Sequence, residues 1–297
     1  MADFEGVYPA LATPMTADGV LNESVLAQIV EFNIQAGVHG FWVAGGTGES
    51  ILLSDEENAR IAQITMEQAA GRAKIIMHVG ASTTERAAGM AEEAAKHNVD
   101  AICCVPPFFY RRNDDEIAEH YRIVAAAADV PLFVYNLPSA TGVEITPPLM
   151  QTIQDRVPQL KGLKHSAPAV PHVHTFSGMG LDCFIGNCRL MLPAMTIGAT
   201  GCVDGPPNML PELWIDIWEA YQARDLDRAE AAQKKASSAY DRLDEVGVAF
   251  HALVKGVLTE RLGVDCGVPR PPGLPMTDEQ RAAIGRIVSE MELAKAA

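Results

Sequence analysis

The sequence predicts an α/β fold, a TIM (β/α)8 barrel with extra C-terminal helices. Eight short apolar segments alternate with longer amphipathic ones, and polar or aromatic residues follow most of the apolar segments. The chain has 297 residues, of which 48% are hydrophobic, and no linker rich in glycine, serine or proline divides it. We therefore expect one domain, with the barrel over about residues 1–209 and helices packed on it over about residues 210–297.

The eight apolar segments predict strands, because each is short and apolar along most of its length, as a parallel sheet covered on its outer side requires. They are Gly6–Ala12, Gly40–Ala44, Lys74–Val79, Ala101–Val105, Leu132–Tyr135, Leu160–Lys164, Cys183–Ile185 and Gly201–Val203. Eight strand–helix units that close on themselves make a barrel of this class.

The segments between the strands have apolar residues three and four positions apart, which predicts helices. Examples are residues 55–70, 84–97, 115–128 and 189–197, and beyond Leu210 the helical runs 225–246 and 250–262 follow without further strands. Ser54 and Glu57 predict a capping box at the start of the first of these helices. A doubly wound sheet is the second choice, because no G-x-G-x-x-G follows the first strand.

The composition argues against several classes of partner. A formal net charge of −15 would repel the phosphates of nucleic acid. The first residues lack the basic and apolar run of a signal peptide, and no stretch of about 18 apolar residues predicts a membrane span, so a cytoplasmic location is expected. The six cysteines show no Cys-x-x-Cys pairing and no ligand spacing with histidine. We expect them to be small core residues in a reducing compartment, with no metal site.

Polar, glycine-rich or aromatic residues mark the ends of six predicted strands. In TIM barrels the active site lies at the C-terminal ends of the strands. The six strand ends are Thr13-Pro14, residues 45–50, residues 106–110, residues 135–138, residues 164–166 and Gly186-Asn187. Because parallel strands end on the same side of the barrel, we expect these residues to converge at one rim.

Lys164 is the first catalytic candidate. Strand alternation places Leu160, Gly162 and Lys164 on one face, which we expect to line the barrel. The glycine leaves room for the lysine, and apolar surroundings disfavour the charged ammonium, which leaves the free amine that attacks a ketone. A lysine at the rim, held in a salt bridge, is the alternative interpretation.

Tyr135 shares a strand face with Phe133 and ends its strand, so its hydroxyl can point into the same lumen and carry protons to and from a substrate oxygen. A core tyrosine with a satisfied hydroxyl is the alternative. The next candidate is the segment Gly45–Glu49. It predicts a cradle for a carboxylate, formed by the backbone amides of Gly46, Thr47 and Gly48 and by the Thr47 hydroxyl. Plain turn chemistry is the alternative there, and nucleotide binding is disfavoured because no lysine follows in Walker spacing.

Together these motifs closely resemble the dihydrodipicolinate synthase / N-acetylneuraminate lyase family of class I aldolases. The resemblance implies that Lys164 forms a Schiff base, that Tyr135 relays protons, and that Thr47 with the adjacent amides holds the pyruvyl carboxylate. It also implies a homotetramer, often a dimer of tight dimers with active sites near the tight interface. The matching motifs run along nearly the whole chain: residues 10–14, 45–49, 107–109, 135–138 with Thr141-Gly142, 162–164 and 268–272.

The sequence departs from the family pattern in the groups that would carry protons. Gly46 stands where many members have threonine or serine, whose hydroxyl links the equivalent of Tyr135 to a tyrosine of the neighbouring subunit. That second tyrosine falls near Phe109, which has no hydroxyl, and Tyr110 could substitute only if its loop shifts. The usual proton relay is then incomplete, and water or another group must bridge the gap in it. The Gly-Gly-Thr-Gly-Glu loop is similar to that of the 5-dehydro-4-deoxyglucarate dehydratases, which also use the Schiff-base lysine.

A second group of departures concerns the substrate. In family members that make the lysine precursor, an arginine in the loop after the Tyr-Asn-x-Pro motif grips the aldehyde partner's carboxylate, and here that loop has Ala140, which cannot do so. His165 is expected to face away from the lumen and to be structural. Gly186 ends the seventh strand, and Arg189 just after it is a candidate anchor for a distal acid group of the substrate.

The sequence thus predicts a lyase that cleaves or dehydrates a 2-keto-3-deoxy sugar acid or related 2-keto acid, with pyruvate as product or co-substrate. No metal or organic cofactor is expected, because the iminium formed on the lysine is itself the electron sink. One alternative is dihydrodipicolinate (4-hydroxy-tetrahydrodipicolinate) synthase. Another is a catalytically silent paralogue that binds a keto acid, motivated by Gly46 and Phe109. A metal-dependent barrel enzyme would need ligands grouped on the strand ends, and the sequence groups none there.

Overall fold

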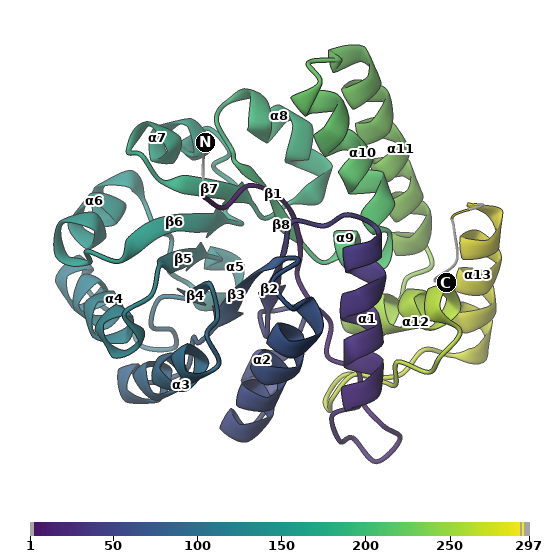
Figure 1. Ribbon diagram of the computed structural model, residues 1–297, viewed down its shortest axis with the longest axis horizontal. Helices are drawn as coiled ribbons and strands as arrows, with labels where there is room; N and C mark the ends of the chain where they lie inside the picture. The colour runs from purple at the N-terminus through teal and green to yellow at the C-terminus, as the bar shows by residue number, and fades with distance from the viewer. Residues whose placement is uncertain (1–2, 292, 294–297) are drawn as a thin grey trace.

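The protein is a barrel of eight parallel strands surrounded by helices (Figure 1). The computed structural model describes residues 3–291 and 293. The strands are β1 (Gly6–Pro9), β2 (Gly40–Val43), β3 (Lys74–His78), β4 (Ala101–Cys104), β5 (Leu132–Asn136), β6 (Leu160–His165), β7 (Asp182–Ile185) and β8 (Gly201–Asp204). The predicted TIM barrel and all eight predicted strands are confirmed.

The sheet runs in the order β1-β8-β7-β6-β5-β4-β3-β2, and every neighbouring pair is parallel. Contacts between β1 and β2 close the ring. The N–H of Leu11 donates to the carbonyl of Trp42 at 3.0 Å, and Ala10 forms a parallel bridge with Trp42. Strand β1 ends at Pro9, earlier than the predicted Ala12, and beyond it Ala10 and Leu11 still bond Asp204 and Trp42.

A helical segment follows each of the first seven strands and covers the outside of the barrel (Figure 1). The predicted capping box is present at α2, where the Ser54 and Glu57 side chains each bond the other's backbone N–H. The predicted helix 189–197 instead starts with a 3-10 turn, η2 (Cys188–Leu190). The helices are α1 (Glu23–Gln35), α2 (Asp55–Ala69), α3 (Thr84–Lys96), α4 (Asp114–Ala128), α5 (Pro138–Thr141), α6 (Pro147–Arg156), α7 (His172–Gly178) and α8 (Met191–Thr196).

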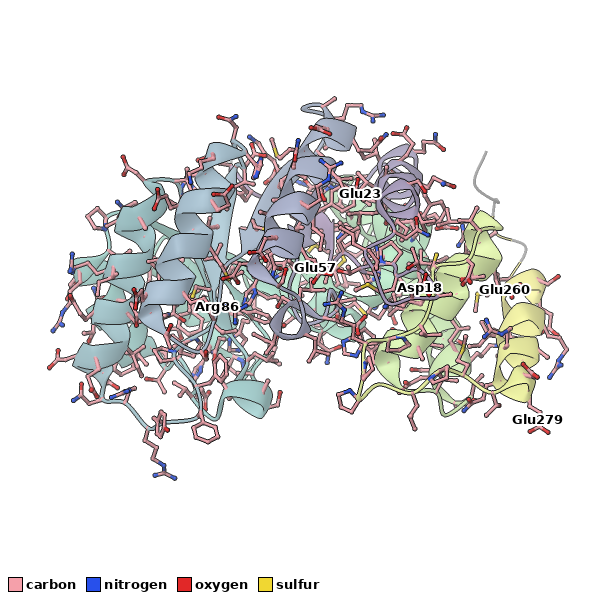
Figure 2. All side chains as sticks on the ribbon, turned by 90° about the horizontal axis from the view of Figure 1, so that it is seen from below. Asp18, Glu23, Glu57, Arg86, Glu260 and Glu279 are labelled. Carbon is pink, nitrogen blue, oxygen red and sulfur yellow. The ribbon has the colours of Figure 1, made fainter. Side chains whose placement is uncertain are left out.

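In the described residues after β8, helices follow and no further strand does, as predicted. They are α9 (Pro206–Met209), α10 (Pro211–Gln222), α11 (Leu226–Asp244), α12 (Phe250–Leu262) and α13 (Asp278–Glu290). Helix α10 packs on β1 and α8, and α12 packs on α1 and α9. Both views place α12 and α13 at the opposite end of the molecule from α3 and α4 (Figures 1 and 2). The division near residue 209 stays a prediction, and no helix in the described part of the chain is long and apolar enough to span a bilayer.

The core has two layers. The outer layer lies between strands and helices, and it includes buried residues such as Ile75, Val134 and Leu163. The inner layer fills the lumen with aromatic and small apolar side chains, among them Trp42 and Phe133. All six cysteines are buried and unpaired, which confirms them as core residues, while the cytoplasmic location stays a prediction.

The inner layer depends on a glycine in β6. A Cβ at Gly162 would lie 2.0 Å from the carbonyl oxygen of Asp182 and 2.7 Å from the ring of Phe133. Neither the neighbouring backbone nor the packed ring can move away without disturbing the sheet. Only glycine therefore fits at this level of the lumen, directly below the end of the strand.

The prediction that Leu160 shares the lumen face with Gly162 and Lys164 is wrong. Leu160 packs against the outer core. The pairing of β5 with β6 shifts by one residue at this point, so that Lys161 has no partner in β5. The Lys161 ammonium instead forms ion pairs with Asp3 at 2.9 Å and Asp182 at 3.4 Å. From Gly162 onward the alternation is as predicted.

We expect Gly162→Ala to lower the free energy of unfolding by about 3 kcal/mol, because the added methyl group overpacks backbone that cannot yield. Gly89→Ala is the matched control, since Gly89 lies inside α3 with no atom within 4 Å of its Cβ position. That change should raise stability by about 0.5 to 1 kcal/mol. Urea denaturation followed by circular dichroism measures both, and equal midpoints for Gly162→Ala and the unaltered protein would contradict the described packing.

Candidate active site

Lys164 lies in the lumen at the C-terminal end of β6. Its residue is 4% exposed, and its Nζ atom is 4.5 Å from the ring centroid of Tyr135 and 5.5 Å from that of Trp42. Lys164 and Tyr135 are register partners on neighbouring strands. Within residues 3–291 and 293 no carboxylate forms an ion pair with Lys164, so the alternative of a salt-bridged rim lysine is wrong. The predicted orientation of Lys164 is confirmed.

Tyr135 is buried beside this amine, with its ring edge-on to those of Trp42 and His78 at centroid distances of 5.6 and 6.1 Å. Its hydroxyl has no hydrogen-bond partner in the part of the chain that the structure describes. A Cβ at Gly46 would lie 3.8 Å from that hydroxyl. The tyrosine hydroxyl therefore faces the mouth of the lumen under the glycine-rich loop and is free to bond a ligand.

The loop after β2 presents free donors to the same space. Thr47 is buried, and among the described residues neither its amide nor that of Gly48 donates to a protein acceptor. The loop lies close to the neighbouring rim segment, because the Thr13 hydroxyl donates to the Gly48 carbonyl at 2.7 Å. A Cβ at Gly48 would lie 3.0 Å from the carbonyl of Leu11. Two amides and one hydroxyl thus remain available for an anion.

A buried ion pair holds this loop from behind. Glu49 adopts a left-handed backbone conformation with φ of 59°, and its carboxylate lies 2.6 Å from the Lys255 ammonium, with side chains 1% and 2% exposed. Burial lowers the pKa of Lys255, and the adjacent Glu49 opposes that shift. Lys255 also donates to the carbonyl of Val268 at 2.8 Å, and the amide of Arg270 donates to Glu49 at 2.8 Å. Helix α12 and the segment after it thereby fix the end of the loop.

Arg270 extends this connection to the surface of the barrel. Its guanidinium pairs with Glu57 on α2 and donates to the carbonyls of Leu52 at 2.8 Å and Gly19 at 3.0 Å. Figure 2 shows Glu57 near the middle of the molecule, whereas Glu279 on α13 lies at its end. The guanidinium lowers the pKa of the Glu57 carboxyl. The closing motif of the chain is therefore part of the support for the candidate site.

His78 is a site residue that the sequence analysis missed. It ends β3, is 3% exposed, and its Nδ1 lies 3.3 Å from the hydroxyl oxygen of Ser50. Burial lowers its pKa to about 4, and the charge of Lys164 acts in the same direction. Its Nε2, like the indole nitrogen of Trp42, is buried without a hydrogen-bond partner among the described residues. Strand alternation from Ile76 would have placed His78 in the lumen.

The two aromatic residues predicted after β4 lie at the surface. Phe109 is 87% exposed, with φ of 78°, and Tyr110 is 68% exposed. Their rings contact edge-on at a centroid distance of 5.0 Å. Neither is among the buried residues that surround the Lys164 amine. The possible role of Tyr110 as a substitute for the absent tyrosine stays a prediction.

The remaining predicted contact residues are placed differently around the rim. Ala140 is exposed on α5. Gly186 follows β7, and its Cβ would lie 1.9 Å from the Ser166 hydroxyl oxygen, two residues beyond the lysine. His165 faces away from the lumen, as predicted, with Nε2 3.0 Å from the carbonyl oxygen of Ala169. These positions allow Gly186 to border the lumen and give His165 a structural role.

Arg189 is directed toward the C-terminal helices. Its guanidinium bonds Asp241 at 2.7 Å and Asp244 at 3.3 Å on α11, and it stacks over the Tyr240 ring with its carbon 4.2 Å from the centroid. To bind a substrate acid group it would have to leave these partners. Its role as an anchor stays a prediction. In the described residues no three histidine, cysteine, aspartate or glutamate side chains are grouped to hold a metal ion.

Comparison with known proteins gives matches over most of the chain. The model of the Dihydrodipicolinate synthetase family matches residues 3–291. An N-acetylneuraminate lyase of Rhizobium meliloti is 30% identical over 82% of each chain. A 4-hydroxy-tetrahydrodipicolinate synthase of Methanopyrus kandleri is 28% identical over 97% of each. The solved structure of Proteus mirabilis N-acetylneuraminate lyase has a TM-score of 0.89 at 26% identity, and the match covers 97% of this chain and 99% of that one.

We expect Lys255→Met to destabilise the protein by about 3 to 5 kcal/mol, because it leaves the Glu49 charge buried without its partner. The double variant Glu49→Gln with Lys255→Met removes both charges and should recover most of that loss. Lys234→Met, which breaks an exposed pair with Glu230, should leave the free energy of unfolding unchanged. Urea denaturation is the measurement, and a Lys255→Met variant as stable as the Lys234→Met control would show that the buried pair does not hold the loop.

Proposed function

The chain belongs to the dihydrodipicolinate synthetase family and is a lyase of the class I aldolase type, and on this premise we propose that it acts through a Schiff base at Lys164. The proposed substrate is a 2-keto-3-deoxy sugar acid or a related 2-keto acid, with pyruvate as product or co-substrate. One observation carries the proposal. The Lys164 amine is enclosed in the lumen, unpaired with any described carboxylate, and faces the Tyr135 ring at 4.5 Å.

The proposed reaction begins when the Lys164 nitrogen attacks the ketone carbon C2 of the substrate and water leaves, which gives an iminium. In cleavage, the iminium accepts the electron pair of the C3–C4 bond as that bond breaks, the C4 hydroxyl proton passes through the Tyr135 hydroxyl to water, and the C4–O bond becomes the carbonyl of the aldehyde product. The enamine is then protonated at C3. In dehydration, the iminium accepts the electron pair of a C3–H bond whose proton passes to water, and the resulting enamine expels the protonated C4 hydroxyl as water. Hydrolysis of the resulting iminium releases the keto acid and restores the amine.

The other residues of the site serve binding and proton transfer. The free amides of Thr47 and Gly48 and the Thr47 hydroxyl hold the substrate carboxylate, which sets C2 above Lys164. The Tyr135 hydroxyl, which has no protein partner in the described chain, carries protons between the reacting oxygens and water. Because Gly46 supplies no hydroxyl beside it, a water molecule completes the proton path.

The second candidate is 4-hydroxy-tetrahydrodipicolinate synthase, which the name of the Methanopyrus kandleri relative favours. That reaction needs a cation for the carboxylate of the aldehyde partner. Here the corresponding position is Ala140, and Arg189, which follows β7, is held by two aspartates. Cleavage or dehydration of a sugar acid therefore fits the rim better than condensation with an amino-acid aldehyde.

Incubation with pyruvate and borohydride should give a mass adduct that maps to Lys164, and Lys164→Ala should abolish it. Tyr135→Phe should still form the adduct but lose turnover by about 100-fold or more, because the proton donor is gone. A screen of 2-keto-3-deoxy sugar acids for pyruvate release or dehydration, run beside pyruvate with aspartate semialdehyde, separates the two candidate reactions. No adduct would sink the Schiff-base proposal, and an adduct without any turnover would favour the silent keto-acid binder.

We further propose that the protein is a homotetramer in which a second copy covers part of the rim. The support is the exposure of large apolar side chains on the two loops after β2 and β4: Ile51 at 53%, Leu52 at 43%, Phe109 at 87% and Tyr110 at 68%. Such side chains gain stability when a partner removes them from water.

Light scattering after size-exclusion chromatography should therefore give about four times the chain mass of 31.9 kDa. The double variant Phe109→Ser with Tyr110→Ser should shift the protein to smaller species. A protein that elutes as a monomer at micromolar concentration would contradict this proposal, and it would leave the chemistry at Lys164 unaffected.

A further inference from the structure

His251, one of the first residues of α12, reaches across to the glycine-rich loop. Its Nε2 donates to the carbonyl oxygen of Gly46 at 2.9 Å, a contact between residues 205 positions apart in the chain. The side chain is partly exposed, whereas the loop residues on either side of Gly46 are buried. The imidazole therefore stands at the mouth of the lumen, on the outer side of the loop.

The bonded carbonyl belongs to the peptide that carries the candidate anion donor. The carbonyl of Gly46 and the N–H of Thr47 are the two ends of one planar trans peptide, so they point in opposite directions. Fixing the carbonyl outward, toward His251, therefore aims the Thr47 N–H inward. The only other bond to this carbonyl in the described residues is from the Glu49 N–H at 3.1 Å, which closes the turn.

Within the described loop this peptide is held by one hydrogen bond only, from the Glu49 N–H. Gly45 and Gly46 have no side chains, and glycine permits backbone rotations that other residues resist. The imidazole adds a second, shorter hydrogen bond to the same carbonyl from outside the loop. Its donor does not depend on the charge of the ring, since Nε2 carries a hydrogen in the imidazolium form and in the tautomer that makes this bond.

Phe250, at the same end of α12, lies close to the Thr47 side chain, because both border Gly205. The ring of Phe250 packs where a Cβ at Gly205 would lie, at 2.3 Å, and that same position is 3.1 Å from the Thr47 hydroxyl oxygen. One turn further along the helix, Lys255 holds Glu49. The start of α12 therefore borders the donor segment, and among the described residues of that helix His251 alone forms a hydrogen bond to the Gly46–Thr47 peptide.

We propose that His251 is a positioning residue for carboxylate binding, which orients the Thr47 amide without touching the reacting atoms. The inference rests on the proposed function, because it assumes that a 2-keto acid places its carboxylate on this amide. It assigns to the C-terminal helices a part in substrate affinity. We expect the effect on substrate binding and not on the chemical step, because the proposed catalytic residues, Lys164 and Tyr135, lie on β6 and β5 and not on this loop.

The test measures borohydride trapping of pyruvate at Lys164 as a function of pyruvate concentration, in the full-length protein. His251→Ala should raise the half-saturating pyruvate concentration about three- to tenfold, the value of one hydrogen bond to a neutral partner, with the maximal trapped fraction unchanged. His251→Gln, whose amide can donate in place of Nε2, should return it to within about twofold. His174→Ala, an exposed histidine on α7, is the control and should match the unaltered protein.

The outcomes separate the inference from its premise. Normal trapping in the unaltered protein with an unchanged half-saturation in His251→Ala would overturn the positioning role and leave the Schiff base intact. A lowered maximal fraction at equal half-saturation would also overturn it, because His251 would then act on the chemistry or on the fold. No adduct in the unaltered protein would overturn the proposed function and this inference with it.

Discussion

The site depends on one buried ion pair, between Lys255 on α12 and Glu49 at the end of the glycine-rich loop. Two opposite charges 2.6 Å apart and almost fully withdrawn from water cannot separate without exposing one charge to an apolar interior. A loop with three glycines in four residues has little rigidity of its own. The ion pair fixes the end of the loop to α12, one residue after the Gly48 amide.

The lumen provides the second constraint. Trp42 on β2 and Phe133 and Tyr135 on β5 fill the barrel, and Gly162 on β6 leaves room for the Phe133 ring below the lysine. The amine is therefore held against aromatic faces, away from any described carboxylate. Such an arrangement keeps solvent and competing charges from the place where a ketone would react. Packing and chemistry are determined here by the same residues.

Much of this architecture follows from the sequence by local rules. Short apolar runs fix the strands, and two-residue alternation from Gly162 correctly puts Lys164 inside, because a buried β-strand leaves a side chain only two faces to choose from. The same rule places Leu160 on the wrong face, because the pairing with β5 shifts by one residue there and the inward and outward positions are exchanged. Such a shift depends on the neighbouring strand, which the local sequence does not describe. His78 could have been found by alternation. His251 and Lys255 could not, because their contacts join helices and loops distant in the chain, and no local pattern encodes such a contact. Arg189 illustrates the same limit, as its aspartate partners lie on α11.

The separation in sequence between the glycine-rich loop and the residues that hold it also affects how the protein folds during synthesis. Glu49 receives the Arg270 amide across 221 residues, and the chain is made from its N-terminus at a few residues per second. Nearly the entire polypeptide must leave the ribosome before the loop acquires its supports. The proposed carboxylate cradle therefore lacks these supports until the segment that contains Arg270 has been synthesised and has folded against the barrel.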